Sequence, residues 1–453
     1  MEQNEKSKML GTMKMSRLVP KVSIPIMFSL LIQALYNIID SIFVARFSGK
    51  ALTAVSLAYP IQMLMIAVST GLGTGINSVV SRKLGERQSL EAKNSAGNGV
   101  FLEFAGFVIF FVFGIFFAKN TFNLLTPDET LRELGGAYLS IVCTCSVGLF
   151  MAISFERLMQ CTGNTVLSMI TQITGAVTNI ILDPIMIFGY FGCPEMGIEG
   201  AAYATVIGQC VSMVLGFVIN QVKNVELRLA FKNLKPKFKI LKDILGVGIP
   251  SVIMQSISTV MNISFNAILI GYGEAAVSVL GIYFKLQSFV FMPVFGLSNG
   301  LIPIVGYNYG AKLRERVYSA IKTALVWALV IMCLGMVIFL TCPEFLLSLF
   351  ESGESGEITS IGIVALRTIC VHFVFAAIGI TLSTVFQAIG KGVYSMIMSL
   401  CRQLVVLVPS AWILSKVGGL DAIWWSFFIA EGVSLVICLI MYRHVNRRIF
   451  KWM

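Results

Sequence analysis

An acid and a proline interrupt an otherwise apolar stretch in the run Asn179-Ile180-Ile181-Leu182-Asp183-Pro184. The stretch is long enough to cross a bilayer, and a carboxylate at the centre of a membrane helix costs about 2.5–3.5 kcal/mol on insertion scales. Pro184 cannot donate a backbone hydrogen bond to the carbonyl of Ile180, so we expect a kink beside Asp183. Asn179 lies one turn earlier on the same helix face. This pattern predicts a polar pocket suited to ion-coupled transport; the alternative is a structural acid held by a neighbouring helix.

A second acid, Asp40, lies at a comparable depth in the first apolar segment. The first and fifth segments run in the same direction, so Asp40 and Asp183 are expected to share one cavity in the outer half. Tyr138, near the outer end of a fourth segment at 135–157, is expected to join them, whereas Glu156 should lie about 20 Å or more away along the axis. Two neighbouring buried carboxylates cannot both stay ionised cheaply, so either one binds a proton or a sodium ion neutralises both.

The composition indicates a membrane protein. Of the 453 residues, 57% are hydrophobic and 13% are charged, whereas soluble domains carry about 25% charged residues. Apolar segments of membrane-spanning length recur about twelve times, which predicts an all-α polytopic fold with twelve transmembrane helices. The basic N-terminus runs straight into the first segment without a small-residue cleavage site, so we interpret it as a cytoplasmic tail and not as a signal peptide.

The net charge of +11 follows membrane topology and does not indicate nucleic-acid binding. Loops on one side are rich in basic residues, among them Lys14, Arg17, Lys21, Arg82, Lys83, Arg87, Lys237, Lys239, Lys242, Arg314, Arg316, Arg443, Arg447 and Arg448. Loops on the other side carry Arg46, Lys50, Lys119, Arg132 and Lys416, mixed with acids. By the positive-inside rule, both termini are expected in the cytoplasm, with the protein in the cell membrane.

The chain repeats itself once, at a spacing of 225 residues: Pro25 recurs as Pro250, and Gly85 as Gly310. Each half therefore holds six segments, and an even number of crossings gives both halves the same orientation, as in many secondary transporters. We predict an N-terminal lobe at 1–222, a basic cytoplasmic linker at 223–242 and a C-terminal lobe at 243–453. Glycines and prolines within the segments are expected either to let a lobe bend between two access states or simply to allow close helix packing.

Several runs together resemble the multidrug and toxic compound extrusion (MATE) family. They are Leu35–Asp40, Phe43–Gly49, Ser81–Glu86 and Asn179–Pro184, and the resemblance extends from about Arg17 to His444. Within the family the chain is similar to the DinF-like branch and its MepA-type exporters, in which the acids lie in the N-terminal lobe. The NorM-like branch instead has a glutamate on the seventh segment, whereas residues 252–270 contain no acid here. The resemblance implies the MATE/MOP-type fold of two six-helix bundles.

The resemblance also implies a cation-coupling site formed by Asp40, Asn179 and Asp183, with Thr205 as a further contributor. The coupling ion is expected to be H⁺ or Na⁺, and no other metal or cofactor is expected. We add Tyr138 to this group because of its predicted depth.

A second group of residues is assigned to substrate contact or gating. Glu156 matches an acidic position of the MepA-type exporters, and it serves either in gating or in a salt bridge with Arg157. Gln33, Tyr36 and Asn37 of the first segment are assigned to the same role.

The remaining intramembrane polar residues receive mainly structural interpretations. Lys285, Arg402 and Glu431 are expected to neutralise one another inside the C-terminal bundle, with a role in transport as the alternative. His372 is interpreted as a packed helix histidine. Glu103 is either functional or held by a neighbouring polar group.

These observations favour a monomeric secondary active antiporter that exports lipophilic, often cationic, small molecules in exchange for H⁺ or Na⁺ by alternating access. The alternative is a flippase of lipid-linked or amphipathic cargo, which basic residues such as Lys285 and Arg402 would favour. Major-facilitator transporters share the two parallel halves, but the run Leu35–Asp40 favours the MATE family. An enzyme is not expected, because the sequence has two histidines, no metal-spaced cluster and no nucleotide-binding loop.

Overall fold

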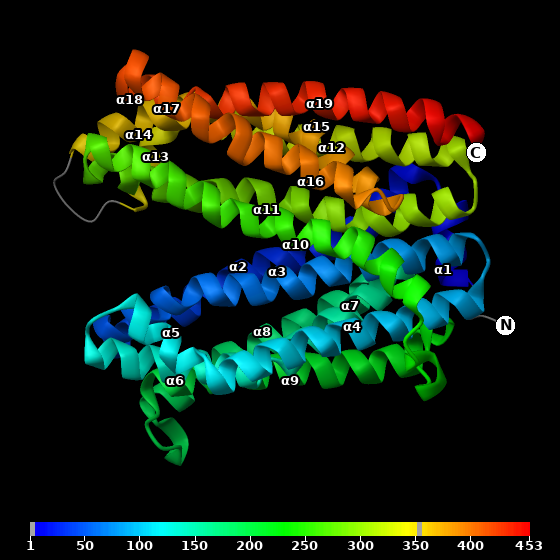
Figure 1. Cartoon of the computed structure of the whole chain (residues 1–453), viewed down its shortest axis with the longest axis horizontal. Helices are drawn as coiled ribbons and strands as arrows, with labels where there is room; N and C mark the ends of the chain where they lie inside the picture. The colour runs from blue at the N-terminus through cyan, green and yellow to red at the C-terminus, as the bar shows by residue number, and fades with distance from the viewer. Residues whose placement is uncertain (1–4, 351–355) are drawn as a thin grey trace.

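The computed structural model describes residues 5–350 and 356–453 and is helical over almost all of them (Figure 1). The N-terminal half contains α1 (Glu5–Thr12), α2 (Met15–Phe47), α3 (Gly49–Gly85), α4 (Ser89–Phe116), α5 (Ala118–Leu125), α6 (Glu129–Thr144), α7 (Val147–Cys161), α8 (Thr165–Phe188) and α9 (Gly197–Lys223). The C-terminal half contains α10 (Phe238–Leu269), α11 (Glu274–Gly310), α12 (Arg314–Thr341), α13 (Pro343–Ser348), α14 (Gly356–Ile369), α15 (Phe373–Ala388), α16 (Gly392–Leu400), α17 (Val408–Val417), α18 (Gly419–Ile423) and α19 (Ser426–Arg448). Short 3-10 turns are η2 (Tyr190–Gly192), η3 (Val225–Leu227), η4 (Phe231–Leu234), η5 (Ile270–Tyr272), η6 (Cys370–His372) and η8 (Phe450–Trp452), while η7 (Cys401–Leu407) is a π-helical segment.

Eleven helical segments of the described chain are long and apolar enough to cross a membrane, and α6 with α7 forms a further span bent by 43°. The predicted all-α fold with twelve transmembrane helices is therefore confirmed.

The fourth span differs from the continuous helix expected at 135–157. Its break lies between α6 and α7, where the hydroxyl of Ser146 donates to the carbonyl of Cys143 at 2.8 Å. A serine hydroxyl that takes up a backbone carbonyl competes with the regular hydrogen bonds of the helix. On the far side of the break, Gly148 packs against the backbone of Cys210 in α9, where a Cβ would lie 2.9 Å from its nitrogen.

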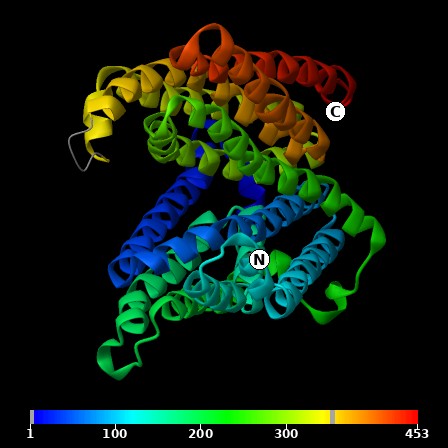
Figure 2. The ribbon, with the colours of Figure 1, turned by 60° about the vertical axis from the view of Figure 1, so that its left-hand side comes forward.

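The helices form two bundles, one coloured blue to green and the other green to red in Figure 1, and the rotated view in Figure 2 separates them as well. Each bundle has its own hydrophobic core. Leu10, Leu18 and Val19, from α1 and the start of α2, are fully buried in the core of the C-terminal bundle. α1 and the start of α2 therefore pack in the C-terminal bundle, although they precede the helices of the N-terminal bundle. The exact lobe boundaries stay a prediction.

We call the end of the molecule that carries both termini the basic end; in Figure 1 the labels N and C mark it. Here the two bundles meet through glycines. A Cβ on Gly75 of α3 would lie 2.4 Å from the carbonyl oxygen of Ile244 in α10, and a Cβ on Gly85 would lie 2.0 Å from that of Tyr307 in α11. Such close approach of backbones requires glycine. These contacts lie in the halves of α3, α10 and α11 nearer the basic end.

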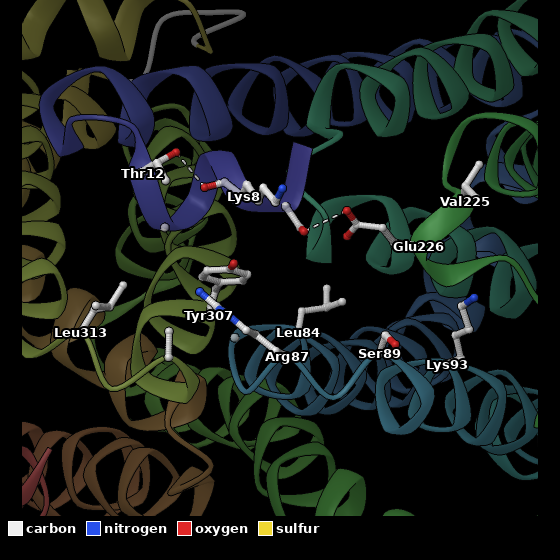
Figure 3. A pocket seen from close by; sticks show the side chains of 14 residues that line it. Lys8, Thr12, Leu84, Arg87, Ser89, Lys93, Val225, Glu226, Tyr307 and Leu313 are labelled. Carbon is white, nitrogen blue, oxygen red and sulfur yellow. Dashed lines mark hydrogen bonds between the residues drawn. The ribbon is translucent and has the colours of Figure 1, made fainter. Parts of the chain in front are cut away.

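The short helix α1 joins parts of the basic end to one another (Figure 3). The carbonyl of Leu10 accepts hydrogen bonds from Asn308 at 2.9 Å and from Arg316 at 3.1 Å, and Ser7 donates to Glu226 of η3 at 2.9 Å. A cavity of about 910 Å³ lies between α1, η3 and the loop that contains Arg87. Burial raises the pKa of Glu226, which lies outside the spans. α1 therefore links the C-terminal bundle to the segment that follows the N-terminal bundle.

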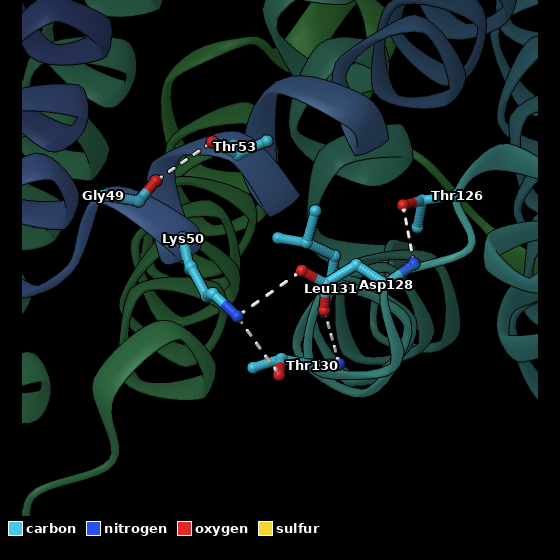
Figure 4. Close-up of polar contacts among 7 residues, drawn as sticks. All are labelled: Gly49, Lys50, Thr53, Thr126, Asp128, Thr130 and Leu131. Carbon is cyan, nitrogen blue, oxygen red and sulfur yellow. Dashed lines mark hydrogen bonds and ion pairs between the residues drawn. The ribbon is translucent and has the colours of Figure 1, made fainter.

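At the opposite end, Asp128 fixes the start of α6 (Figure 4). Its carboxylate accepts the backbone N–H groups of Thr130 at 2.9 Å and Leu131 at 3.3 Å, as an N-cap does. The hydrogen bond from Leu131 and the neighbouring Lys50, 3.4 Å away, lower the pKa of Asp128. Through Lys50, Asp128 ties the start of α3 to α6, the helix that carries Tyr138.

Candidate cation and substrate site

Asp183, Asn179 and Thr205 form a polar cluster between α8 and α9. The side-chain amide of Asn179 lies 3.2 Å from an oxygen of Asp183 and 3.3 Å from the hydroxyl of Thr205. The first contact is local, since it joins residues one turn apart. The second depends on the close approach of the two helices, where Gly175 and Gly208 face one another: a Cβ on Gly208 would lie 2.7 Å from the carbonyl oxygen of Gly175. The two glycines therefore bring Thr205 to the cluster.

Asp40 of α2 and Tyr138 of α6 complete this part of the lobe. Asp40 is close enough to Asp183 for the two carboxyl groups to interact electrostatically, and Tyr138 lies within range of both acids. The hydroxyl of Tyr138 accepts a hydrogen bond from Gln62 of α3 at 3.0 Å. Within the predicted coupling group, the structure thus joins Asn179, Asp183 and Thr205 by direct contacts, and Asp40 and Tyr138 lie within electrostatic range of Asp183.

Three oxygens of this group are buried and have no hydrogen-bond partner among the described residues: Oδ1 of Asp40, Oδ2 of Asp183 and Oδ1 of Asn179. A buried polar atom without a partner costs about 1–3 kcal/mol, and more when it is charged. Oxygens of carboxylates and amides are the ligands that hard cations prefer. The donor set therefore fits a proton or a small hard cation.

A cavity of about 140 Å³ lies beside this group, inside the N-terminal bundle. Gln33, Tyr36 and Glu156 line it, together with Asn179 and Thr205. Three of the four residues predicted for substrate contact or gating therefore reach one cavity. Asn179 and Thr205 belong both to the lining of this cavity and to the predicted coupling group.

Asn37, the fourth predicted gating residue, lies on α2 with its side chain exposed and is not one of the described residues that line the cavity. The spacing of four residues from Gln33 predicted the same helix face for Asn37, but in the structure its side chain is exposed instead.

Glu156 contacts a residue that the sequence reasoning missed. One of its oxygens accepts a hydrogen bond from Gln172 of α8 at 2.6 Å, whereas Arg157 donates to Gln160 at 2.8 Å. Gln172 lies two turns before Asn179 on α8, so the seven-residue spacing that places residues on one helix face pointed to it.

A family model described as MatE matches residues 25–185 and 250–413 of this chain. The chain belongs to the MATE family. The two matched ranges begin at Pro25 and Pro250, which are equivalent positions of the internal repeat. The predicted family resemblance is confirmed, and the protein is a membrane transporter of this family.

Among the relatives, the multidrug export protein MepA of Staphylococcus saprophyticus is 27% identical over 423 residues, which cover 93% of this chain and 92% of that protein. The protein of the same name from Staphylococcus haemolyticus is 26% identical over 427 residues, with 94% and 93% covered.

Solved structures agree with this assignment. A crystal structure of a MATE protein in complex with MaL6 has a TM-score of 0.93 at 26% identity, and an outward-facing multidrug resistance MATE transporter has a TM-score of 0.92 at 26% identity; each match covers 99% of both chains. A MOP superfamily transporter from Pyrococcus furiosus, described as having a binding pocket of reverse polarity, has a TM-score of 0.90 at 27% identity, with 97% of both chains covered.

Outside this site, the charged residues and the histidine of the C-terminal bundle contact different partners. Arg402 and Glu431 form an ion pair at 3.0 Å, as expected, whereas Lys285 lies 5.7 Å from the ring centre of Phe350 and so does not join them. His372 packs among aromatic rings, with Nδ1 2.5 Å from the carbonyl oxygen of Ile369.

Glu103 is fully buried in the N-terminal bundle. One of its oxygens accepts a hydrogen bond from Ser69 of α3 at 2.8 Å. This contact favours the interpretation that a neighbouring polar group holds Glu103 over a role in transport.

Proposed function

We propose that the protein is a secondary active antiporter that exports lipophilic, often cationic, small molecules and admits H⁺ or Na⁺ in exchange. The observation that carries the proposal is the group of buried oxygens on Asp40, Asn179 and Asp183 that have no hydrogen-bond partner among the described residues. Carboxylates inside a membrane protein are stable only when they are protonated or paired. A coupling ion that visits this group supplies the missing partner.

The same acids provide the coupling between ion and substrate. When H⁺ or Na⁺ neutralises Asp40 and Asp183, the cavity beside them loses its attraction for a positive substrate. When the ion leaves, that attraction returns, so substrate and ion compete for one negative charge. Each unit charge that moves through about 100 mV supplies about 2.3 kcal/mol for expulsion of the substrate.

Alternating access of the two lobes moves the substrate across the membrane. We infer that the basic end is cytoplasmic, by the positive-inside rule. The close glycine contacts at that end support an outward-open state, which must separate there to become inward-open. One chain contributes both lobes, so we propose that the monomer is the working unit.

The substrate range follows from the cavity and from the relatives. The cavity of about 140 Å³ in the N-terminal bundle has both apolar and polar residues, but it is smaller than the roughly 300–1,000 Å³ typical of drug-sized ligands. We propose that it receives the charged end of a substrate whose apolar part lies between the lobes. The names of the multidrug export relatives support varied small molecules as cargo.

Ethidium efflux from cells that express the protein tests this function. The variant Asp183→Asn should lose most of the efflux, because an amide cannot exchange a proton or balance the charge of a cation. Asp421→Asn, an exposed acid at the opposite end to the termini, is the matched control and should leave efflux unchanged. Undiminished efflux by Asp183→Asn at equal expression would refute the proposed coupling site.

A further inference from the structure

The C-terminal bundle contains a second cavity, of about 410 Å³, that residues of α10, α11, η6, α15, η7 and α19 line. This volume lies within the roughly 300–1,000 Å³ of sites for small organic molecules. Phe291, Phe295 and Phe427 give it an aromatic surface, and Arg402 and Glu431 give it one positive and one negative side chain. The cavity therefore has the apolar area and the charges of a ligand site.

The internal repeat relates this cavity to the one in the N-terminal bundle but gives it different chemistry. Ser258, Met261 and Phe291 line the second cavity. They stand at the repeat spacing of 225 residues from Gln33, Tyr36 and Ile66, which line the first. At the same spacing, Phe265 stands in place of Asp40. The coupling acid is therefore not duplicated, and an arginine–glutamate pair provides the charge instead.

The ion pair leaves bonding capacity for a ligand. Nη1 of Arg402 lies 3.0 Å from Oε1 of Glu431, and their side chains are 22% and 9% exposed. A guanidinium has five N–H donors and a carboxylate has two oxygens, so this single N–O contact leaves several groups unused. The next residue, Gln403, also lines the cavity, and its buried Oε1 has no partner within the described parts of the chain.

The backbone around Arg402 departs from regular α-helix. Arg402 and Gln403 lie in the π-helical segment η7, and insertions of this kind occur frequently at functional sites. Pro409 follows shortly after and has no backbone N–H for the carbonyl of Val405, so one regular helix hydrogen bond is missing next to η7.

We propose that this second cavity binds amphipathic zwitterions, with the ligand's carboxylate on Arg402, its ammonium on Glu431 and its apolar body against Phe291, Phe295 and Phe427. The site has no net charge, so a zwitterion leaves every buried charge paired. A purely cationic or purely anionic ligand would add an uncompensated charge, which is costly in a buried site. This binding requires no ion coupling in the N-terminal lobe, and it extends the range of the transporter beyond cations.

Fluorescence titration of the purified Asp183→Asn variant, in which the first lobe lacks one of the acids that attract cations, tests the proposal with three matched probes. Nε-dansyl-lysine is a zwitterion, its methyl ester is a cation, and its Nα-acetyl derivative is an anion with the same aromatic body. The zwitterion should bind at least about tenfold more tightly than the other two, the difference expected for a hydrogen bond to a charged group. Equal affinity for the three probes would overturn the proposal.

Variants of the pair give a pattern that a merely structural role would not produce. Arg402→Gln should switch the preference to the cationic ester, and Glu431→Gln should switch it to the acetylated anion. Lys285→Gln is a control that should keep the preference for the zwitterion, and the wild type should bind the zwitterion as tightly as Asp183→Asn does. Loss of zwitterion binding in Asp183→Asn would assign the probe to the first lobe and refute the second site.

Phe295→Ala keeps the test decisive if the charge variants do not fold. Phe295 is partly exposed in the cavity wall and takes no part in the ion pair. Its truncation should weaken binding of all three probes by up to about tenfold without changing their order. Unchanged affinity would show that the probes do not occupy this cavity.

Discussion

Replacement of Gly75 by alanine should open the basic end of the transporter. In the structure a Cβ at this position would lie 2.4 Å from the carbonyl oxygen of Ile244 and 3.1 Å from the nitrogen of Gly248. Ordinary contacts begin at 3.4 Å, so α3 and α10 must separate by about 1 Å at this point. Both contact atoms belong to the backbone and cannot rotate aside.

The cost of this clash applies only to the state in which the lobes touch here. An added methyl group in a well-packed interface costs about 1–3 kcal/mol. If the inward-open state relieves it, the equilibrium between the two states shifts by roughly 5–150-fold. Alanine also gains up to about 1 kcal/mol of helix propensity over glycine, but equally in both states.

Spin-label distances between the two lobes measure the shift. Gln88 and Glu315 are exposed at the basic ends of the two lobes and suit a label pair. The ten free cysteines must first be replaced. Gly75→Ala should move the distance distribution to longer values, whereas Gly246→Ala on α10, where a Cβ meets nothing within 4 Å, should leave it in place. Identical distributions for the two variants would refute the assignment of this contact to one access state.

Three further predictions concern single contacts. Asn179→Ala removes the amide that contacts Asp183 and should weaken ion-driven transport about tenfold, as loss of a charge-assisted hydrogen bond does, in a vesicle flux assay. Gly175→Ala should destabilise the protein by about 1–3 kcal/mol, because α8 and α9 must move apart, whereas Gly432→Ala has open space and should not; thermal unfolding compares them, and equal melting temperatures would contradict this packing. Burial raises the pKa of Glu226, so this residue stabilises the fold below the ordinary pKa of glutamate, and the stabilisation is lost as pH rises through the raised pKa. Hydrogen exchange of residues 5–12 should therefore slow as pH falls, after correction for intrinsic rates. Glu226→Gln should abolish that dependence.

Local patterns in the sequence predicted the parts of the site that lie on one helix. The contact between Asn179 and Asp183 follows from their spacing of one turn, and the span count follows from hydropathy. The position of Asp40 relative to Asp183 could be predicted as well, because the alternating direction of the spans fixes depth.

Contacts between distant segments were less predictable. The break after α6 depends on the hydroxyl of Ser146 and on packing against α9, which the apolar pattern does not encode. Leu10 is buried in the C-terminal bundle, where its carbonyl meets Asn308 and Arg316, which lie 298 and 306 residues further along the chain. Lys285 was expected to share the neutralising group with Arg402 and Glu431 because of its charge. Its position on α11 instead places its ammonium group 5.7 Å from the ring centre of Phe350.

Counter-flow measured in reconstituted vesicles is the most direct test of ion coupling at Asp40 and Asp183. Vesicles receive either a pH gradient or a sodium gradient, and ethidium movement is recorded together with the movement of the imposed ion. The wild type should exchange ethidium for one of these ions, and Asp40→Asn with Asp183→Asn should abolish both flows. Full gradient-driven exchange by the double variant would contradict the account.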